Sequence, residues 1–127
     1  MQENHLYEYA VIRVVPKVER EEFLNVGVIL YARKQKFLGT IYHLDVHRLQ
    51  AFSPELDIAV LELNLQSFKK ICEASPDAGP IGKLDIASRF RWLTATRSTI
   101  LQSSKVHPGF CGNPQATLQR LFEQLVL

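Results

Sequence analysis

One stretch of the chain predicts the fold class: Phe23-Leu24-Asn25-Val26-Gly27-Val28-Ile29-Leu30-Tyr31-Ala32. It is rich in β-branched and aromatic residues, which is typical of a β-strand. Successive side chains of a strand point to opposite faces, so every second residue from Leu24 to Ala32 falls on one unbroken apolar face. The opposite face carries Asn25 and Gly27 between apolar residues. The pattern predicts a strand over residues 23–32.

Two further strands are expected on either side of this stretch. Residues 7–15 are also rich in β-branched and aromatic residues, and both of their faces are largely apolar toward the end. Pro16 cannot continue a paired strand, so residues 7–15 predict a central strand that ends there. Residues 33–36 form a polar hairpin connection to a third strand over residues 37–43. The three strands are expected to form an antiparallel meander.

Two helix starts share the same signal, a capping residue followed by proline. Ser53 and Pro54 predict a helix that runs to about residue 74, preceded by a short helical turn from Asp45. Asn113 and Pro114 predict a C-terminal helix. Its expected core positions have helical spacing and are Leu118, Leu121, Phe122 and Leu125.

The segment between the two helices is expected to return to the sheet. Residues 75–82 contain two prolines and two glycines and predict a loop. Residues 90–93 and 98–102 predict strand, followed by a second loop over residues 103–112. The expected fold is α+β, with an antiparallel sheet of about four or five strands. The early three-stranded meander and the late strand would pack against two main helices, and residues 1–127 are expected to form a single domain.

Composition and charge limit the classes of function. The chain has 127 residues, of which 46% are hydrophobic and 22% charged, as in ordinary globular proteins. A formal net charge of +2 excludes a global field that would attract nucleic acid or an acidic membrane. The chain shows neither a signal-peptide pattern nor an apolar run of about 20 residues, so a cytoplasmic location is expected. Its two cysteines are far apart in the sequence and do not predict a disulfide.

No motif assigns a reaction to the chain. It has no nucleotide-binding glycine loop, no GxSxG sequence and no Cys-His pair at a recognisable spacing. His43 and His47 are four residues apart, but a predicted break between strand and turn separates them and no third ligand lies nearby. No metal and no cofactor is therefore expected, and a function without catalysis is favoured.

Two candidate site residues interrupt the strand over residues 23–32. Gly27 indicates either a packing glycine or the close approach of another backbone or a ligand. Asn25 lies on the same expected face, and a buried amide needs hydrogen-bond partners. It predicts either a ligand contact or a structural clamp on the connection over residues 19–22.

A second group of candidates lies in residues 89–98. Its members are Arg89, Arg91, Trp92, Arg97 and Ser98. Alternation in the predicted strand places Phe90 and Trp92 on one face, opposite the first two arginines. Guanidinium groups beside a hydroxyl suit a phosphate or an acidic partner surface, and surface ion pairs explain the same residues equally well. His107, in the second expected loop, is a further candidate for binding or proton transfer.

Three blocks of the sequence form a recognisable combination: YAVIRVVP at residues 9–16, EFLNVGVIL at residues 22–30 and RFRWLTATRSTILQ at residues 89–102. Together they resemble the bacterial domain-of-unknown-function family 3037. The resemblance continues through residues 106–109 into the C-terminal helix and so covers nearly the whole chain. The positions that fall on the family motifs are Asn25, Gly27, Arg89, Trp92, Arg97 and Ser98.

The family has no established activity, so the resemblance implies function only indirectly. Its members are expected to be encoded beside a HipA-like kinase protein, which suits a small accessory or regulatory protein that acts through protein contacts. The arginine segment would then be the recognition face. The alternative is a protein or enzyme that binds a phosphate-containing ligand or nucleic acid through Arg89, Arg97 and Ser98. The blocks over residues 22–30 and 89–102, the two motif blocks, contain Asn25 and Arg97. If these two residues lie on opposite faces of the sheet, the two motif blocks cannot form one site.

Overall fold

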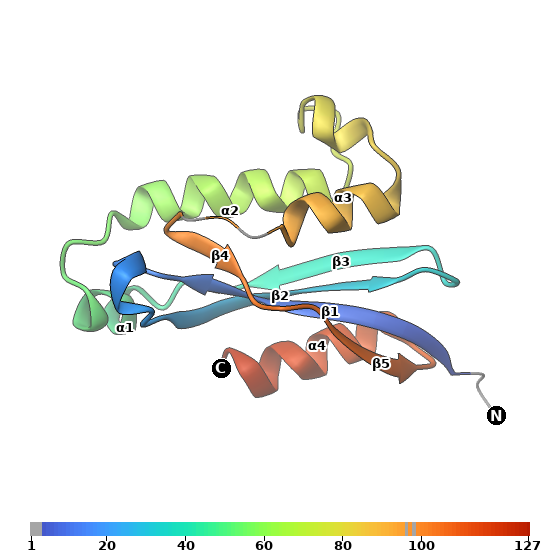
Figure 1. Ribbon diagram of the computed structural model, residues 1–127, viewed down its shortest axis with the longest axis horizontal. Helices are drawn as coiled ribbons and strands as arrows, with labels where there is room; N and C mark the ends of the chain where they lie inside the picture. Colours follow the sequence, from blue (N-terminus) through green and yellow to red (C-terminus); the bar gives the residue numbers. More distant parts are fainter. Residues whose placement is uncertain (1–3, 96, 98) are drawn as a thin grey trace.

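The computed structural model describes residues 4–95, 97 and 99–127 and contains a five-stranded antiparallel sheet (Figure 1). Its strands are β1 (His5–Val14), β2 (Leu24–Ala32), β3 (Phe37–Tyr42), β4 (Leu101–Ser103) and β5 (His107–Cys111). The first three form the predicted meander in the order β3-β2-β1. Two strands extend it because β4 and β5 both pair with the outer edge of β1. The α+β fold class is confirmed.

β1 is central, as predicted, because both of its edges are paired. β4 pairs with its C-terminal end and β5 with its N-terminal end. Between them, the backbone N–H of Ser104 donates to the carbonyl oxygen of Val11 at 2.8 Å. The Ser104 hydroxyl oxygen accepts from the backbone N–H of Val11, also at 2.8 Å. A side chain thus supplies one of the acceptors that a continuous partner strand would have supplied.

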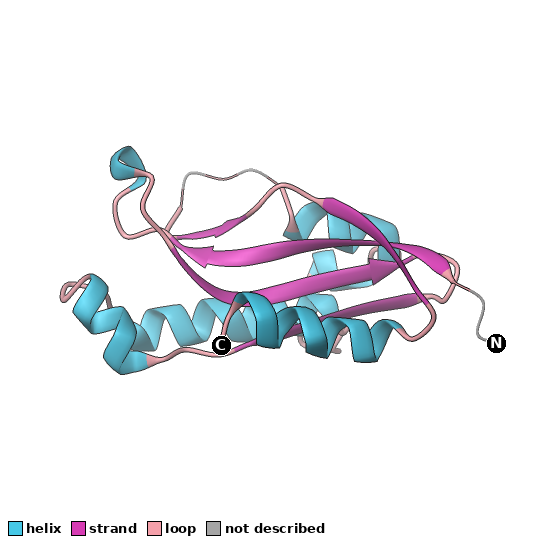
Figure 2. Ribbon diagram, turned by 90° about the horizontal axis from the view of Figure 1, so that it is seen from below, coloured by secondary structure: helices cyan, strands magenta, loops and turns pink. Residues whose placement is uncertain are grey.

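Helices cover both faces of the sheet (Figure 2). On one face lies α4 (Pro114–Leu125), which packs against apolar side chains of β1 and β2. On the other lie α2 (Ile58–Cys72) and α3 (Ile86–Leu93), with Leu49 of α1 (Val46–Phe52) in the same core. Two short 3-10 helices, η1 (Val18–Arg20) and η2 (Pro80–Lys83), complete the elements of the described residues.

A β-bulge divides the apolar face that was expected to run unbroken along β2. Ile12 pairs with Gly27 and Arg13 pairs with Asn25, so Val26 is the extra residue. Val26 packs in the cluster beneath α1 and α2, whereas Val28 packs beneath α4. Both residues were expected on the same face. The bulge changes the phase of the alternation, so Val26 faces α1 and α2 while Val28 faces α4.

The helix boundaries confirm one predicted start and correct the other. Asn113 caps α4 by accepting from the backbone N–H of Ala116, and Pro114 is the first helical residue, as predicted. Ser53 does not start a helix, because it ends α1. The next helix starts after Asp57, whose carboxylate accepts from the backbone N–H of Val60. The expected helical turn at Asp45 is the capped start of α1.

The largest error of the sequence interpretation is residues 89–93, which form helix rather than strand. Asp85 caps α3 by accepting from the backbone N–H of Ser88 at 2.7 Å, and this hydrogen bond lowers the pKa of its carboxyl group. Phe90 and Leu93, three residues apart, are buried against the sheet. Phe90 and Trp92 therefore do not share a strand face. The segment forms a helix because capping and burial together outweigh its aromatic strand propensity.

Two further expectations are corrected around β4 and β5. The late strand runs over residues 101–103 rather than 98–102, and residues 99 and 100 form a bend. Residues 107–111, expected to be a loop, form β5. Pro108 is compatible with this because β5 is an edge strand, where an N–H is not needed on the outer side.

Both cysteines are buried and free. Cys72 belongs to the core beneath α2 and α3, and Cys111 belongs to the core beneath α4, on the other face of the sheet. Burial raises the pKa of the Cys72 thiol to about 12, so this thiol stays protonated at neutral pH. None of the described helices is long and apolar enough to cross a membrane.

Candidate functional site

A groove with a volume of about 540 Å³ lies on the face of the sheet that α2 and α3 cover. Its walls are one flank of α2, the C-terminal end of α3 and the segment over residues 99–103. Ile12 of β1 and the side chains of Phe68 and Leu93 contribute apolar surface to the lining. Volumes of this size are typical of sites that hold a ligand or several anchoring side chains.

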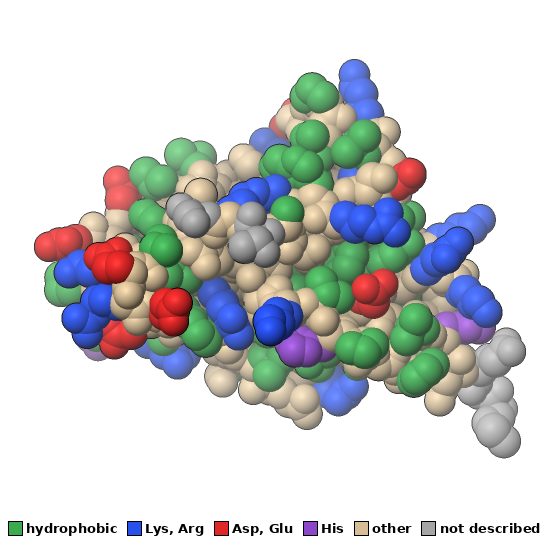
Figure 3. Space-filling model, in the orientation of Figure 1, with side chains coloured by type: hydrophobic (Ala, Val, Ile, Leu, Met, Phe, Trp, Pro, Cys, Tyr) green, Lys and Arg blue, Asp and Glu red, His purple; other side chains and the backbone are tan. Residues whose placement is uncertain are grey.

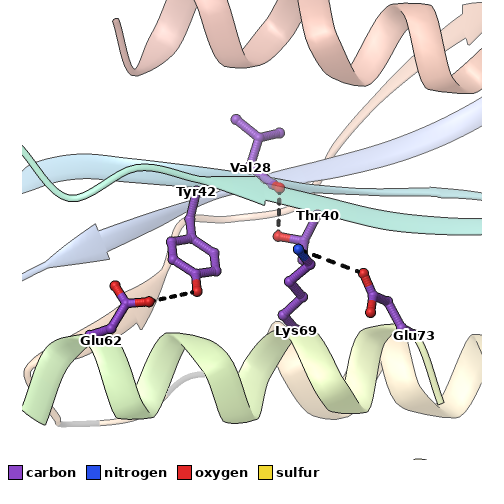
Figure 4. Close-up of polar contacts among 6 residues, drawn as sticks. All are labelled: Val28, Thr40, Tyr42, Glu62, Lys69 and Glu73. Atoms are coloured by element: carbon purple, nitrogen blue, oxygen red, sulfur yellow. Dashed lines mark hydrogen bonds and ion pairs between the residues drawn. The ribbon is translucent and has the colours of Figure 1, made fainter. Parts of the chain in front are cut away.

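The α2 wall of the groove is uncharged. Asn64, Ser67 and Ile71 are three and four residues apart, so they lie on the same flank of the helix and line the groove. The opposite flank of α2 carries charged residues instead (Figure 4). There Glu62 accepts a hydrogen bond from the hydroxyl of Tyr42, and Lys69 lies 3.9 Å from a carboxylate oxygen of Glu73. The helix therefore presents a polar amide, a hydroxyl and apolar carbon to the groove and its charges elsewhere.

Trp92 and Arg97 form the wall at the end of α3. The guanidinium carbon of Arg97 lies 4.1 Å from the centroid of the Trp92 ring, in a cation–π contact. Arg97 also donates a hydrogen bond to the backbone carbonyl oxygen of Trp92. These two contacts fix the guanidinium beside the groove. Among the described residues, no carboxylate forms an ion pair with it.

Large apolar side chains are exposed along the rim. Trp92 is 39% exposed and Ile100 is 45% exposed, and both line the groove. Val60, 46% exposed, lies one helical turn before Asn64 on the same flank of α2, and Leu63, 63% exposed, is its neighbour. Figure 3 shows hydrophobic side chains exposed over α2 and around η2, while acidic and basic side chains are mixed at the end of this face that carries α1. Several large apolar side chains exposed on one surface are typical of an interaction site.

The structure separates the arginines that the sequence placed in one cluster. Arg97 lines the groove, whereas Arg89 and Arg91 do not. Arg89 donates from Nη1 to the carbonyl oxygen of Leu84 at 2.7 Å, which ties the start of α3 to the preceding loop. Arg91 is exposed on α3. Ser98 lies outside the described residues.

Asn25 and Arg97 lie on opposite faces of the sheet, so the two motif blocks do not form one site. The amide nitrogen of Asn25 donates to the carbonyl oxygen of Leu125 at 3.0 Å, at the C-terminal end of α4. Asn25 is therefore a structural clamp, but it holds α4 and not the connection over residues 19–22. Gly27 is a packing glycine, because a Cβ there would lie 2.9 Å from both the Ile41 carbonyl oxygen and the Tyr42 Cβ.

His107 does not line the groove either. It stands at the first position of β5, and its ring centroid lies 5.4 Å from that of Tyr9 on the paired strand. This arrangement is a cross-strand aromatic contact of the kind that stabilises antiparallel pairs.

The sequence interpretation missed the α2 wall of the groove. The signal was present, because Val60, Asn64, Ser67 and Ile71 recur at helical spacing on one flank. To predict the groove from this spacing, one would have to know which flank of the helix faces residues 99–103. That segment is more than 25 residues away along the chain. No group of three or more His, Cys, Asp or Glu side chains in the described ranges could hold a metal ion.

The chain was compared with family models, curated proteins and solved structures. A family model described as a protein of unknown function, DUF3037, matches residues 9–126. No curated protein and no solved structure matches the chain significantly. The matched range includes both motif blocks, the groove and the α4 clamp. The chain therefore belongs to the DUF3037 family.

Proposed function

We propose that this protein is a non-enzymatic bacterial accessory protein that binds a partner protein through the groove beside α2. One observation carries the proposal: a groove bordered by exposed large apolar side chains, including the single tryptophan of the chain. Tryptophan and arginine are the residues most enriched at the energetic centres of protein interfaces. Here they are stacked on each other at the end of the groove.

The lining supports binding rather than catalysis. Among the described lining residues, the only ionisable side chain is that of Arg97. A guanidinium stays protonated at neutral pH and cannot exchange a proton with a substrate. General acid–base catalysis needs a group that can do so within hydrogen-bond reach of the reacting atoms.

The first partner to test is the HipA-like kinase protein whose gene is expected beside that of this family. The expected gene neighbourhood suggests the pair, and the groove offers a surface for docking. The two buried, free thiols fit the reducing cytoplasm in which we place this interaction. A regulatory role would follow if docking changes the activity of the kinase.

Isothermal titration of the purified HipA-like protein into this protein tests the proposal. We expect binding by the native chain and a loss of at least tenfold in affinity for Ile100→Asp, which places a charge on the apolar rim. Phe110→Ser is the matched control, because Phe110 is 71% exposed on β5 and does not line the groove. Equal effects of the two substitutions would exclude the groove as the docking surface. Absence of binding by the native chain would exclude this partner.

The alternative of a phosphate site built from Arg89, Arg97 and Ser98 has less support. Arg89 is directed to the carbonyl oxygen of Leu84 and does not line the groove beside Arg97. A phosphate clamp needs several donors that converge on one anion. Titration with inorganic phosphate distinguishes the two functions, since the accessory protein is expected to bind it no more tightly than in the millimolar range.

A further inference from the structure

We infer that the groove selects an acidic amphipathic helix of the partner, with apolar side chains on the α2 rim and a carboxylate on Arg97. This inference rests on the proposed function and specifies the chemistry of the segment that docks. Its basis is the juxtaposition of an uncharged helical wall, an exposed apolar rim and one cation without an acidic partner in the described part of the chain.

Charge complementarity favours an acidic segment. A guanidinium has five N–H donors, and among the described residues the one acceptor that Arg97 reaches is the carbonyl oxygen of Trp92. The stack on Trp92 holds the guanidinium plane in place, so little side-chain entropy is lost when a carboxylate binds to its remaining N–H groups. A basic segment would instead place like charges together in a partly desolvated groove.

The apolar rim favours a segment with large aliphatic anchors. Val60 is exposed one helical turn before the lining residue Asn64 on α2, with Leu63 exposed beside it, and Ile100 lines the opposite wall. The groove lining also includes the polar but uncharged side chains of Asn64 and Ser67. An apolar side chain of the partner can pack beside them without burying a charge. Aliphatic anchors of a docked segment would bury against this surface, and the hydrophobic effect would stabilise the complex.

The wall over residues 99–103 favours a helix over an added strand. The hydroxyl of Thr99 donates to the carbonyl oxygen of Leu101, and the Gln102 amide donates to the carbonyl oxygen of Thr99. These backbone acceptors are therefore occupied by side chains of the same segment. Strand addition depends on free main-chain groups along an edge, whereas a helix in a groove is held by its side chains.

The single tryptophan makes occupancy of the groove directly measurable. Two synthetic helical peptides of about 14 residues, long enough for three to four turns, would share leucines at i, i+3 and i+7. They would contain no tryptophan and differ only in flanking residues, Glu in one and Lys in the other. We expect the Glu peptide to change the emission of Trp92 and to bind at least about tenfold more tightly than the Lys peptide.

Two variants assign the preference to Arg97. Arg97→Gln is expected to bring the two affinities to within about twofold, because it removes the charge and keeps a planar polar group. Arg120→Gln on α4, an exposed arginine on the opposite face of the sheet, is expected to keep the preference. Circular dichroism of both variants checks that each remains folded. A third peptide, the Glu peptide with a central proline, is expected to lose binding because proline breaks the helix.

The outcomes separate this inference from the proposed function. Equal affinity of the Glu and Lys peptides would overturn selection of an acidic segment and leave docking of a partner in the groove intact. Full binding of the proline peptide would overturn the helical part. If no peptide changes the Trp92 emission and Ile100→Asp leaves binding of the HipA-like protein unaltered, both the inference and the groove function are wrong.

Discussion

At the scale of single residues, Gly27 shows how close contact excludes a side chain. We expect Gly27→Ala to lower the free energy of unfolding by about 1–3 kcal/mol, the usual cost of overpacking a core. The added Cβ would meet a carbonyl oxygen and the Cβ of Tyr42 at 2.9 Å, and neither atom can move without shifting β3. Urea unfolding measures the change.

The control for this substitution is Lys34→Ala in the exposed hairpin between β2 and β3. It removes a solvated side chain and is expected to change the stability by no more than about 0.5 kcal/mol. A Gly27→Ala variant as stable as this control would contradict the prediction. It would show that β3 shifts at little cost and that position 27 tolerates a side chain.

At the scale of elements, the edge of β1 depends on Ser104. We expect Ser104→Ala to cost about 1–3 kcal/mol, because it leaves the buried backbone N–H of Val11 without its acceptor between β4 and β5. Ser103→Ala is the matched control. Ser103 is half-buried, and among the residues that the structure describes its hydroxyl donates only to the carbonyl oxygen of Ser104, so a smaller loss is expected.

Hydrogen exchange gives this prediction a local readout. The amide of Val11 should exchange faster in Ser104→Ala than in the native chain, whereas amides of β2 and β3 should change only as much as the global stability does. Unchanged protection at Val11 would show that water or a shifted β4 replaces the hydroxyl.

At the scale of the whole molecule, α4 is one of the two layers that cover the sheet. Leu118, Leu121 and Phe122 are buried in the core with Val28 and Leu30 of β2. We expect deletion of residues 116–127 to expose this core and to abolish the cooperative thermal transition, which calorimetry would detect. Deletion of Leu127 alone, which is 71% exposed, should preserve the transition. A cooperative transition in the longer deletion would show that α4 is dispensable for folding.

The local features of this fold could be predicted because each depends on neighbouring residues. Alternating β-branched residues identify β1 and β2, and the hairpin over residues 33–36 joins β2 to β3. Asn113 and Pro114 identify the start of α4 within one residue, because a cap satisfies amides only a few positions away. The α+β class and the membership in the family follow from these patterns and from the motif blocks.

Contacts between distant residues account for what the sequence did not reveal. Residues 86–93 are helical because Phe90 and Leu93 bury together on a sheet face that other segments build. The bulge at Val26 is set by the pairing of β1 with β2, and it sends Asn25 to α4, away from Arg97. The groove likewise exists only where α2 meets residues 99–103. Local propensities determine which residues form a helix or a strand. Burial against segments distant in sequence determines which side of that helix or strand stays exposed, and a binding site is made of such exposed sides.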